Sequence, residues 1–325
     1  SYSVTGVQTC ALPICAVRES VPVALACAPR SSVKLAFPVP GTSGQATDDR
    51  AIRFGFTDRY GVKIYERTVR LVSGNILAAR MKRAGGASSG AAASSDGAGW
   101  HMDGVTVALL PDSTLTVKTA DGREIARGPY VRVGRVPTIG ERRTYGNLKL
   151  AYWEPPLLTK PSAVSVAVSR DGGNLVLTVR AKYALPGDWT RAVISAAVLT
   201  FRPGGVIDVA SELKPESGEG ALMEFGPAWD FPGADAVSWL GGGPYPAFPF
   251  KDTLDEHGVW KLTSGDPFFA GNRRHVEMAR IGGAADGVGI LTAPSDIGWE
   301  RGAGGVTVSM NLRIAGLGTK FHPRA

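Results

Sequence analysis

His275 and Glu277 are the two side chains whose types and spacing most directly suggest acid–base chemistry. They fall in residues 268–280, a segment that begins as a loop and continues as a strand, and strand residues two apart project to the same face. A histidine and a carboxylate on one face can serve as a general acid and a general base toward a bound hydroxyl group. The alternating polar face of a half-solvated strand explains the same spacing without catalysis and is the simpler interpretation.

The other titratable residues form no recognisable catalytic or metal-binding pattern. His101, His257 and His322 are scattered, and no His, Cys or Asp spacing suggests zinc or another transition metal. No glycine-rich loop joins a strand to a helix, so phosphate or dinucleotide binding is not indicated. We therefore predict no metal and no cofactor. The acidic pairs are interpreted as loop and edge charges: Asp255 with Glu256, Glu216 with Glu219, and Glu224 with Asp230.

Composition places the chain among turn-rich β proteins. Of its 325 residues 44% are hydrophobic, and 42 glycines and 22 prolines punctuate it without any long helix-period stretch. The 36 basic and 29 acidic side chains give a net charge of +7 that is spread along the chain, so we expect no nucleic acid partner. No apolar run approaches the length of about 20 residues that spans a bilayer, so we expect no membrane segment.

The three cysteines, Cys10, Cys15 and Cys27, all lie near the start of the sequence. Residues 4–14 resemble the conceptual translation of a sequencing-library adapter, so we interpret residues 1–15 as non-native and exclude them from the fold prediction. On that interpretation Cys27 is the single native cysteine, expected to be a small buried hydrophobe, and the native chain begins further upstream.

Strand-length apolar or alternating segments, separated by turn signals, predict an all-β chain of two parts. Residues 16–83 are predicted to be a partial immunoglobulin-like sandwich, residues 84–101 a low-complexity linker rich in Ala, Gly and Ser, and residues 102–325 a large antiparallel sandwich. The predicted strands are residues 32–39, 51–56, 62–72, 105–110, 114–118, 130–133, 148–152, 164–169, 175–183, 192–201 and 206–213.

The chain is organised around residues 236–280. A short apolar strand runs into Gly241-Gly242-Gly243-Pro244, where glycine freedom and the missing proline donor predict that the strand stops and turns outward. An aromatic-rich loop follows, and the strand carrying His275 and Glu277 returns. Loops held on a rigid sheet often carry binding sites, although turn-rich composition fits a purely structural connection equally well.

Three segments in order resemble the C-terminal sandwich domain, the small chain, of family 2 β-galactosidases. Residues 239–252 resemble that family's Trp-x-Gly-x-Gly-Pro signature, although Pro246 stands for its Glu and Lys251-Asp252 for its Asp-Arg. Gly271-Asn272-Arg273 is similar to its Gly-Asn-Arg segment, and residues 128–138 to its Gly-Pro to Arg-Ala-Pro-Thr segment. Residues 28–67 resemble, more loosely, the immunoglobulin-like domain that precedes the small chain.

The resemblance implies a galactose mutarotase-like β-supersandwich that completes the active site of a β-galactosidase-like glycoside hydrolase. Its partners would be a β-galactoside or related β-glycoside and the N-terminal domains of the same polypeptide, because in that family both catalytic carboxyls lie on a preceding barrel that this chain does not encode. The family's mobile loop falls on residues 138–143, and the position of its sugar-facing Trp falls near Met310. The residues expected near the sugar are Arg135, Thr138, Gly140, Glu141 and Met310.

Two rival interpretations remain open. The chain could be a free-standing mutarotase-like enzyme in which His275 and Glu277 do the chemistry, or a non-catalytic carbohydrate-binding or structural module. The accessory interpretation assigns no catalytic residue to this chain.

Overall fold

The computed structural model describes residues 2–11, 16–23, 31–34, 36, 50–70, 94–95, 99–102, 104–112, 114–133, 157–171, 174–184, 192–202, 205–216, 224–249, 254–283, 287–302, 304–314, 316–317 and 323–324. Over these ranges the protein is all β and every strand pairing is antiparallel, which confirms the predicted fold class of an all-β sandwich. No helix in these ranges is long and apolar enough to cross a membrane.

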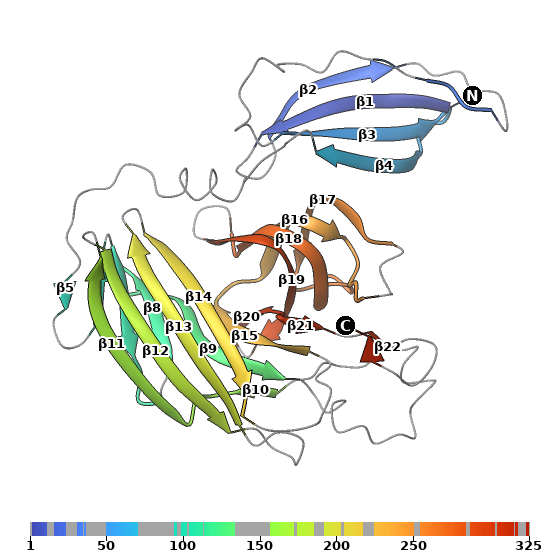
Figure 1. Cartoon of the computed structure of the whole chain (residues 1–325). Coiled ribbons are helices and arrows are strands. Elements are labelled where there is room, and N and C mark those ends of the chain that lie inside the picture. The colour runs from blue at the N-terminus through green and yellow to red at the C-terminus, as the bar shows by residue number, and fades with distance from the viewer. Residues whose placement is uncertain are drawn as a thin grey trace.

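A small N-terminal sheet has the strand order β2-β1-β3-β4 (Figure 1). Its strands are β1 (Tyr2–Ala11), β2 (Ala16–Val23), β3 (Arg50–Asp58) and β4 (Lys63–Arg70). The predicted strands at 51–56 and 62–72 are thus confirmed, whereas residues 31–34 and 36 are not in a strand. The adapter-like segment forms β1 and pairs with both β2 and β3. That this segment is non-native and that the sheet is an immunoglobulin-like remnant stay predictions.

The large sheet runs in the order β17-β16-β18-β19-β20-β15-β9-β8-β7-β6-β5, with β10 on β9 and β21 on β15. Its strands are β5 (Ser94–Ser95), β6 (Trp100–Met102), β7 (Val105–Leu109), β8 (Leu115–Thr119), β9 (Glu124–Val133), β10 (Leu157–Thr159), β15 (Glu224–Pro232), β16 (Ala236–Gly243), β17 (Glu256–Thr263), β18 (Gly271–Ile281), β19 (Val288–Gly302), β20 (Gly305–Met310) and β21 (Arg313–Ile314). Because β5 and β6 belong to it, this sheet begins inside the predicted linker.

A four-stranded sheet, ordered β11-β12-β13-β14, covers the β7–β9 part of the large sheet (Figure 1). Its strands are β11 (Ala163–Asp171), β12 (Asn174–Ala184), β13 (Ala192–Arg202) and β14 (Val206–Pro215), and a last pair is formed by β22 (Gly316–Leu317) and β23 (Pro323–Arg324). The structure confirms the strands predicted at 105–110, 114–118, 130–133, 164–169, 175–183, 192–201 and 206–213. The strand predicted at 148–152 lies outside the described residues.

The core lies between these two sheets. Alternate residues of β12 and β13 are buried, which is the pattern expected when one face of each strand packs inward and the other meets solvent. Leu177 and Leu199 from the four-stranded sheet join Val107 and Leu115 from the large sheet in one hydrophobic cluster. The cluster continues along β16, β18, β19 and β20 of the large sheet.

Trp239 and Trp299 contact each other in this part of the core, and Arg273 packs against both rings. The two tryptophan rings lie 4.8 Å apart, and the Arg273 guanidinium carbon is 5.3 Å from the first ring and 4.9 Å from the second. Arg273 is fully buried and donates hydrogen bonds to the carbonyl oxygens of Phe268 and Phe269. Burial lowers the pKa of Arg273 to about 9, so the guanidinium stays charged at neutral pH.

The glycines of β16 make room for this packing instead of ending the strand. β16 includes all three glycines and ends at Gly243, directly before Pro244. This corrects the prediction that the chain leaves the sheet at the glycines. A Cβ on Gly243 would lie 2.7 Å from Trp260 Cδ1 and 2.9 Å from Trp239 Cζ2. Two indole rings thus occupy the space beside Gly243. The glycines stay paired with β17, whereas the pairing of β16 with β18 ends at Leu240.

Candidate functional site

The outer face of the large sheet, turned away from the core, carries a continuous group of polar side chains on strands that are neighbours in space. Strand alternation sends Val131, Phe225 and Val308 to the core and their neighbours to the outer face. We call this group the polar face; its side chains are those of Arg127, Tyr130, Arg132, Glu224, Asp230, Asn272, Glu300, Thr307, Ser309 and Asn311, and Gly298 lies among them.

A buried cluster of one arginine and two glutamates lies at the centre of the polar face. Arg132 donates from Nη1 to Glu300 Oε1 at 2.7 Å and from Nη2 to Glu300 Oε2 at 3.2 Å. Its Nε lies 2.8 Å from Glu224 Oε1, an ion-pair contact whose N–H does not point at the oxygen. The side chains of Arg132 and Glu224 are 7% and 4% exposed, whereas Glu300 is 25% exposed. The cluster carries one surplus negative charge, close to solvent only at Glu300.

Hydrogen bonds extend this cluster across the sheet to β18. Ser309 Oγ donates to Glu224 Oε1 at 3.2 Å, and Asn311 Nδ2 donates to Asn272 Oδ1 at 2.8 Å. Gly298 lies between them, because a Cβ there would be 2.9 Å from Ser309 Oγ and 3.1 Å from Asn311 Nδ2. The glycine lets the polar side chains close over the strand. Asn272 Nδ2 in turn donates to the carbonyl oxygen of Ala247, which ties the loop after β16 to the polar face.

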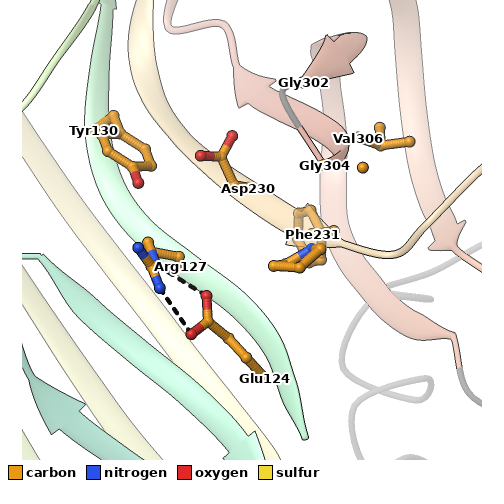
Figure 2. A pocket seen from close by; sticks show the side chains of 10 residues that line it. Glu124, Arg127, Tyr130, Asp230, Phe231, Gly302, Gly304 and Val306 are labelled. Carbon is orange, nitrogen blue, oxygen red and sulfur yellow. Dashed lines mark hydrogen bonds and ion pairs between the residues drawn. The ribbon is translucent and has the colours of Figure 1, made fainter.

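A pocket opens at one end of the polar face, between β9, β15 and the turn that joins β19 to β20 (Figure 2). Its volume is about 290 Å³. Glu124 and Arg127, both on β9, line one wall and form a bidentate pair, with Nε–Oε1 and Nη2–Oε2 distances of 2.8 and 2.9 Å. That hydrogen bonding lowers the pKa of Glu124 and raises the pKa of Arg127.

Tyr130 on β9 and Asp230 on the adjacent strand β15 also line the pocket (Figure 2). Burial, followed by the charge of Asp230 and a hydrogen bond to it, raises the pKa of the Tyr130 hydroxyl to about 12, so the phenol stays protonated at neutral pH. Thr307 Oγ1 also donates to Asp230 Oδ1, at 2.6 Å. Gly302, Gly304 and Gly305 complete the rim, which is therefore mostly backbone on that side.

Four of the five residues expected near the sugar, Arg135, Thr138, Gly140 and Glu141, lie outside the described residues. The fifth, Met310, is the last residue of β20, and its partly buried side chain packs against the hydrophobic core cluster. Its backbone neighbours Ser309 and Asn311 belong to the polar face. The substrate-proximal role of Met310 stays a prediction.

The structure separates His275 from Glu277. β18 has register shifts on both sides of Val276, and His275 adopts a φ of 53°, so simple alternation fails there. His275 is exposed and Glu277 is 5% exposed. The Glu277 carboxylate lies instead beside His257 of β17, with Nε2 3.8 Å from Oε1. An acid–base pair at this place would combine Glu277 with His257, and no spacing in the sequence selects that histidine.

Arg274, beside His275, faces Asp296 of β19 at 3.6 Å. Burial raises the pKa of Asp296, and the positive charge of Arg274 opposes that rise.

Within the described part of the chain, no group of three or more His, Cys, Asp or Glu side chains is arranged to hold a metal ion.

Sequence reasoning missed the acidic residues of the polar face. Glu224 and Asp230 were interpreted as loop and edge charges, but both lie on β15, Glu224 buried at 3% and Asp230 on the pocket wall. Their even spacing of six residues places them on one face of a strand, and the intervening Gly226 and Ala228 are even-spaced too. This even spacing is the feature of the sequence that predicts Glu224 and Asp230 on one face of a strand.

No protein-family model and no curated protein matches this sequence.

Proposed function

We propose that the chain is the carbohydrate-contacting C-terminal part of a β-galactosidase-like glycoside hydrolase and acts on β-galactosides or related β-glycosides only together with a catalytic domain. The observation that carries the proposal is the polar face, where hydrogen-bonding groups held by ion pairs adjoin a pocket. Oriented polar groups beside a small concavity suit sugar hydroxyls, which need both donors and acceptors. The ordered resemblance of three segments to the small chain supports the same proposal.

The polar groups described here are arranged for binding and not for glycoside cleavage. A retaining hydrolase needs a carboxyl pair about 5 to 5.5 Å apart in which one group is a free nucleophile and the other a protonated acid. The two glutamates nearest each other on the polar face, Glu224 and Glu300, both bind Arg132. Because one guanidinium contacts both carboxylates, neither is the free nucleophile that such a pair requires. The catalytic carboxyls would come from another domain.

The test is sugar binding and turnover by the full chain. We expect methyl β-galactoside to bind with a millimolar Kd in ligand-observed NMR, about −4 kcal/mol, because separate rim contacts rarely do better after immobilisation of the ligand. We expect no hydrolysis of an aryl β-galactoside. Absence of binding at saturating millimolar concentrations of every β-glycoside tried, or hydrolysis by the chain itself, would overturn the proposal.

A second candidate, a mutarotase-like enzyme, is favoured by one observation. Buried Glu277 lies within ion-pair distance of His257, and a carboxylate beside an imidazole can move protons to and from a sugar hydroxyl. Anomer interconversion followed by polarimetry, in the full chain and in Glu277→Gln, separates the candidates. Acceleration that the substitution abolishes would establish the mutarotase-like function; equal, uncatalysed rates would leave the accessory function.

A further inference from the structure

The charges of the residues that line the pocket between β9, β15 and the β19–β20 turn indicate which class of ligand it can bind. Its lining contains two carboxylates, Glu124 and Asp230, and one cation, Arg127, so its formal charge is −1. The remaining lining consists of Tyr130, Phe231, Pro232, three glycines and Val306. Two charges outside the lining act on it: Asp112, which is itself paired with Lys160 at 2.6 Å, and Lys118, whose positive charge is the weakest of the influences on Glu124.

The pocket keeps hydrogen-bonding capacity after its internal contacts are counted. Arg127 has five N–H donors, of which Nε and Nη2 are used once each by Glu124. Asp230 accepts from Thr307 and Tyr130, and a carboxylate has about four acceptor positions. The lining therefore offers guanidinium donors and carboxylate acceptors from paired positions of the adjacent strands β9 and β15. A polyhydroxylated ring, in which each hydroxyl donates and accepts, matches such a mixed lining.

Size and shape limit the ligand to one ring. A volume of about 290 Å³ is close to the lower bound of ordinary ligand sites and corresponds to about ten water molecules at 30 Å³ each. Backbone at Gly302, Gly304 and Gly305 forms one rim, and a Cβ at Gly304 would meet nothing within 4 Å, so a ring can approach the main chain there.

From these features we infer that the pocket binds a single neutral pyranose unit and discriminates against uronic acids. The inference rests on the proposed carbohydrate-contacting function and specifies the sugar class. A sugar carboxylate would meet a lining whose surplus charge is negative and whose single guanidinium is already paired with Glu124. Two like charges about 4 Å apart repel by about a factor of five in Kd in bulk water, and by more in a partly buried site.

The experiment measures binding of galactose and of galacturonate to the full chain by NMR, in wild type and three variants. In wild type we expect the Kd for galacturonate to be about ten-fold weaker. Asp230→Asn removes the surplus charge with little change in shape, so the difference between the two sugars should shrink to about two-fold. Gly304→Leu places a side chain at the open rim of the pocket and should abolish the binding of both sugars. The control is Gly289→Leu, at the far end of β19 with an equally unobstructed Cβ, which should leave the Kd of both sugars unchanged.

Each outcome decides a separate statement. Equal binding of the two sugars in wild type overturns the charge discrimination and leaves the proposed function standing. Binding of galactose that Gly304→Leu does not weaken places the sugar elsewhere and overturns the assignment of the pocket. Failure of every sugar to bind the wild-type chain overturns the proposed function itself. Far-ultraviolet circular dichroism and thermal unfolding of all variants establish that they are folded.

Discussion

Substitution of Arg132 by methionine tests whether the polar face is an integrated ion-pair cluster. Methionine keeps much of the length of the arginine stem but removes the guanidinium, so the buried Glu224 carboxylate loses the cation 2.8 Å away. At an effective dielectric constant near 20, charges at that distance attract by about 6 kcal/mol before desolvation is counted. Removing one partner of a buried pair typically destabilises a protein by about 3 to 5 kcal/mol. We expect a loss in that range at pH 7.

The loss should depend on pH in a defined direction. In the variant, burial without the guanidinium raises the folded-state pKa of Glu224 above its unfolded value of about 4.3. A group with a raised folded-state pKa contributes stability below its unfolded pKa and loses that contribution as pH rises through the folded pKa. The free-energy difference between variant and wild type should therefore be small near pH 4 and grow toward pH 7.

Urea unfolding followed by tryptophan fluorescence at pH 4 and pH 7 measures both quantities, since Trp239 and Trp299 are buried reporters. The control is the double variant Arg132→Met with Glu224→Gln, in which no carboxylate is stranded. It should recover much of the stability at pH 7 and lose most of the pH dependence. A loss of equal size at both pH values, or a double variant no more stable than the single one, would refute the ion-pair account and leave only a packing defect.

Three further outcomes follow from other parts of the structure. Gly226→Ala, whose Cβ would overlap the Met310 carbonyl oxygen, should lower the free energy of urea unfolding by about 2 kcal/mol or more, whereas Gly289→Ala, with open space around it, should be neutral or slightly stabilising. Arg273→Met removes charged hydrogen bonds to the carbonyl oxygens of Phe268 and Phe269 and should lower the free energy of unfolding by about 2 to 3 kcal/mol, with a change in tryptophan emission; an unchanged spectrum would contradict the contact of Arg273 with both indole rings. Hydrogen bonds to Lys160 and Thr114 lower the pKa of Asp112 to about 2, so an NMR titration should place its midpoint there, and the stability it contributes should persist above pH 4 and be lost only as pH falls toward 2.

Much of the fold could be predicted from local sequence because each signal acts over a few residues. In β12 and β13 the alternation of apolar and polar side chains is nearly unbroken, and the Asp121-Gly122 turn supplies the positive φ, 84° at Gly122, that closes the β8–β9 hairpin. The prediction that β16 stops at its glycines is wrong because it, too, rests on neighbouring residues alone. Their requirement comes from Trp239 and Trp260 pressing on Gly243, a contact that no neighbouring residue reveals.

The motif residues that carry the resemblance also have a structural explanation. Gly271 packs against Pro246, since a Cβ there would lie 2.9 Å from Pro246 Cβ, and Asn272 donates to the carbonyl oxygen of Ala247. Arg273 is enclosed by the tryptophans of β16 and β19. Residues 25 apart in the sequence, such as Ala247 and Asn272, therefore hold each other in place. These contacts explain the residue types at these positions by packing and hydrogen bonding alone.

The polar face could not be predicted because it depends on which strands become neighbours. Arg132 on β9, Glu224 on β15 and Glu300 on β19 meet only because β20 and β15 insert between β19 and β9, an order unrelated to the order along the chain. Each of these residues looks like an ordinary surface charge in its own strand. A buried ion pair is weak support for stability, since apolar residues of similar volume often serve as well. Its value here is positional: the shared guanidinium holds together two carboxylates from strands that are separated by β20, and so fixes the polar face next to the strands that carry the pocket.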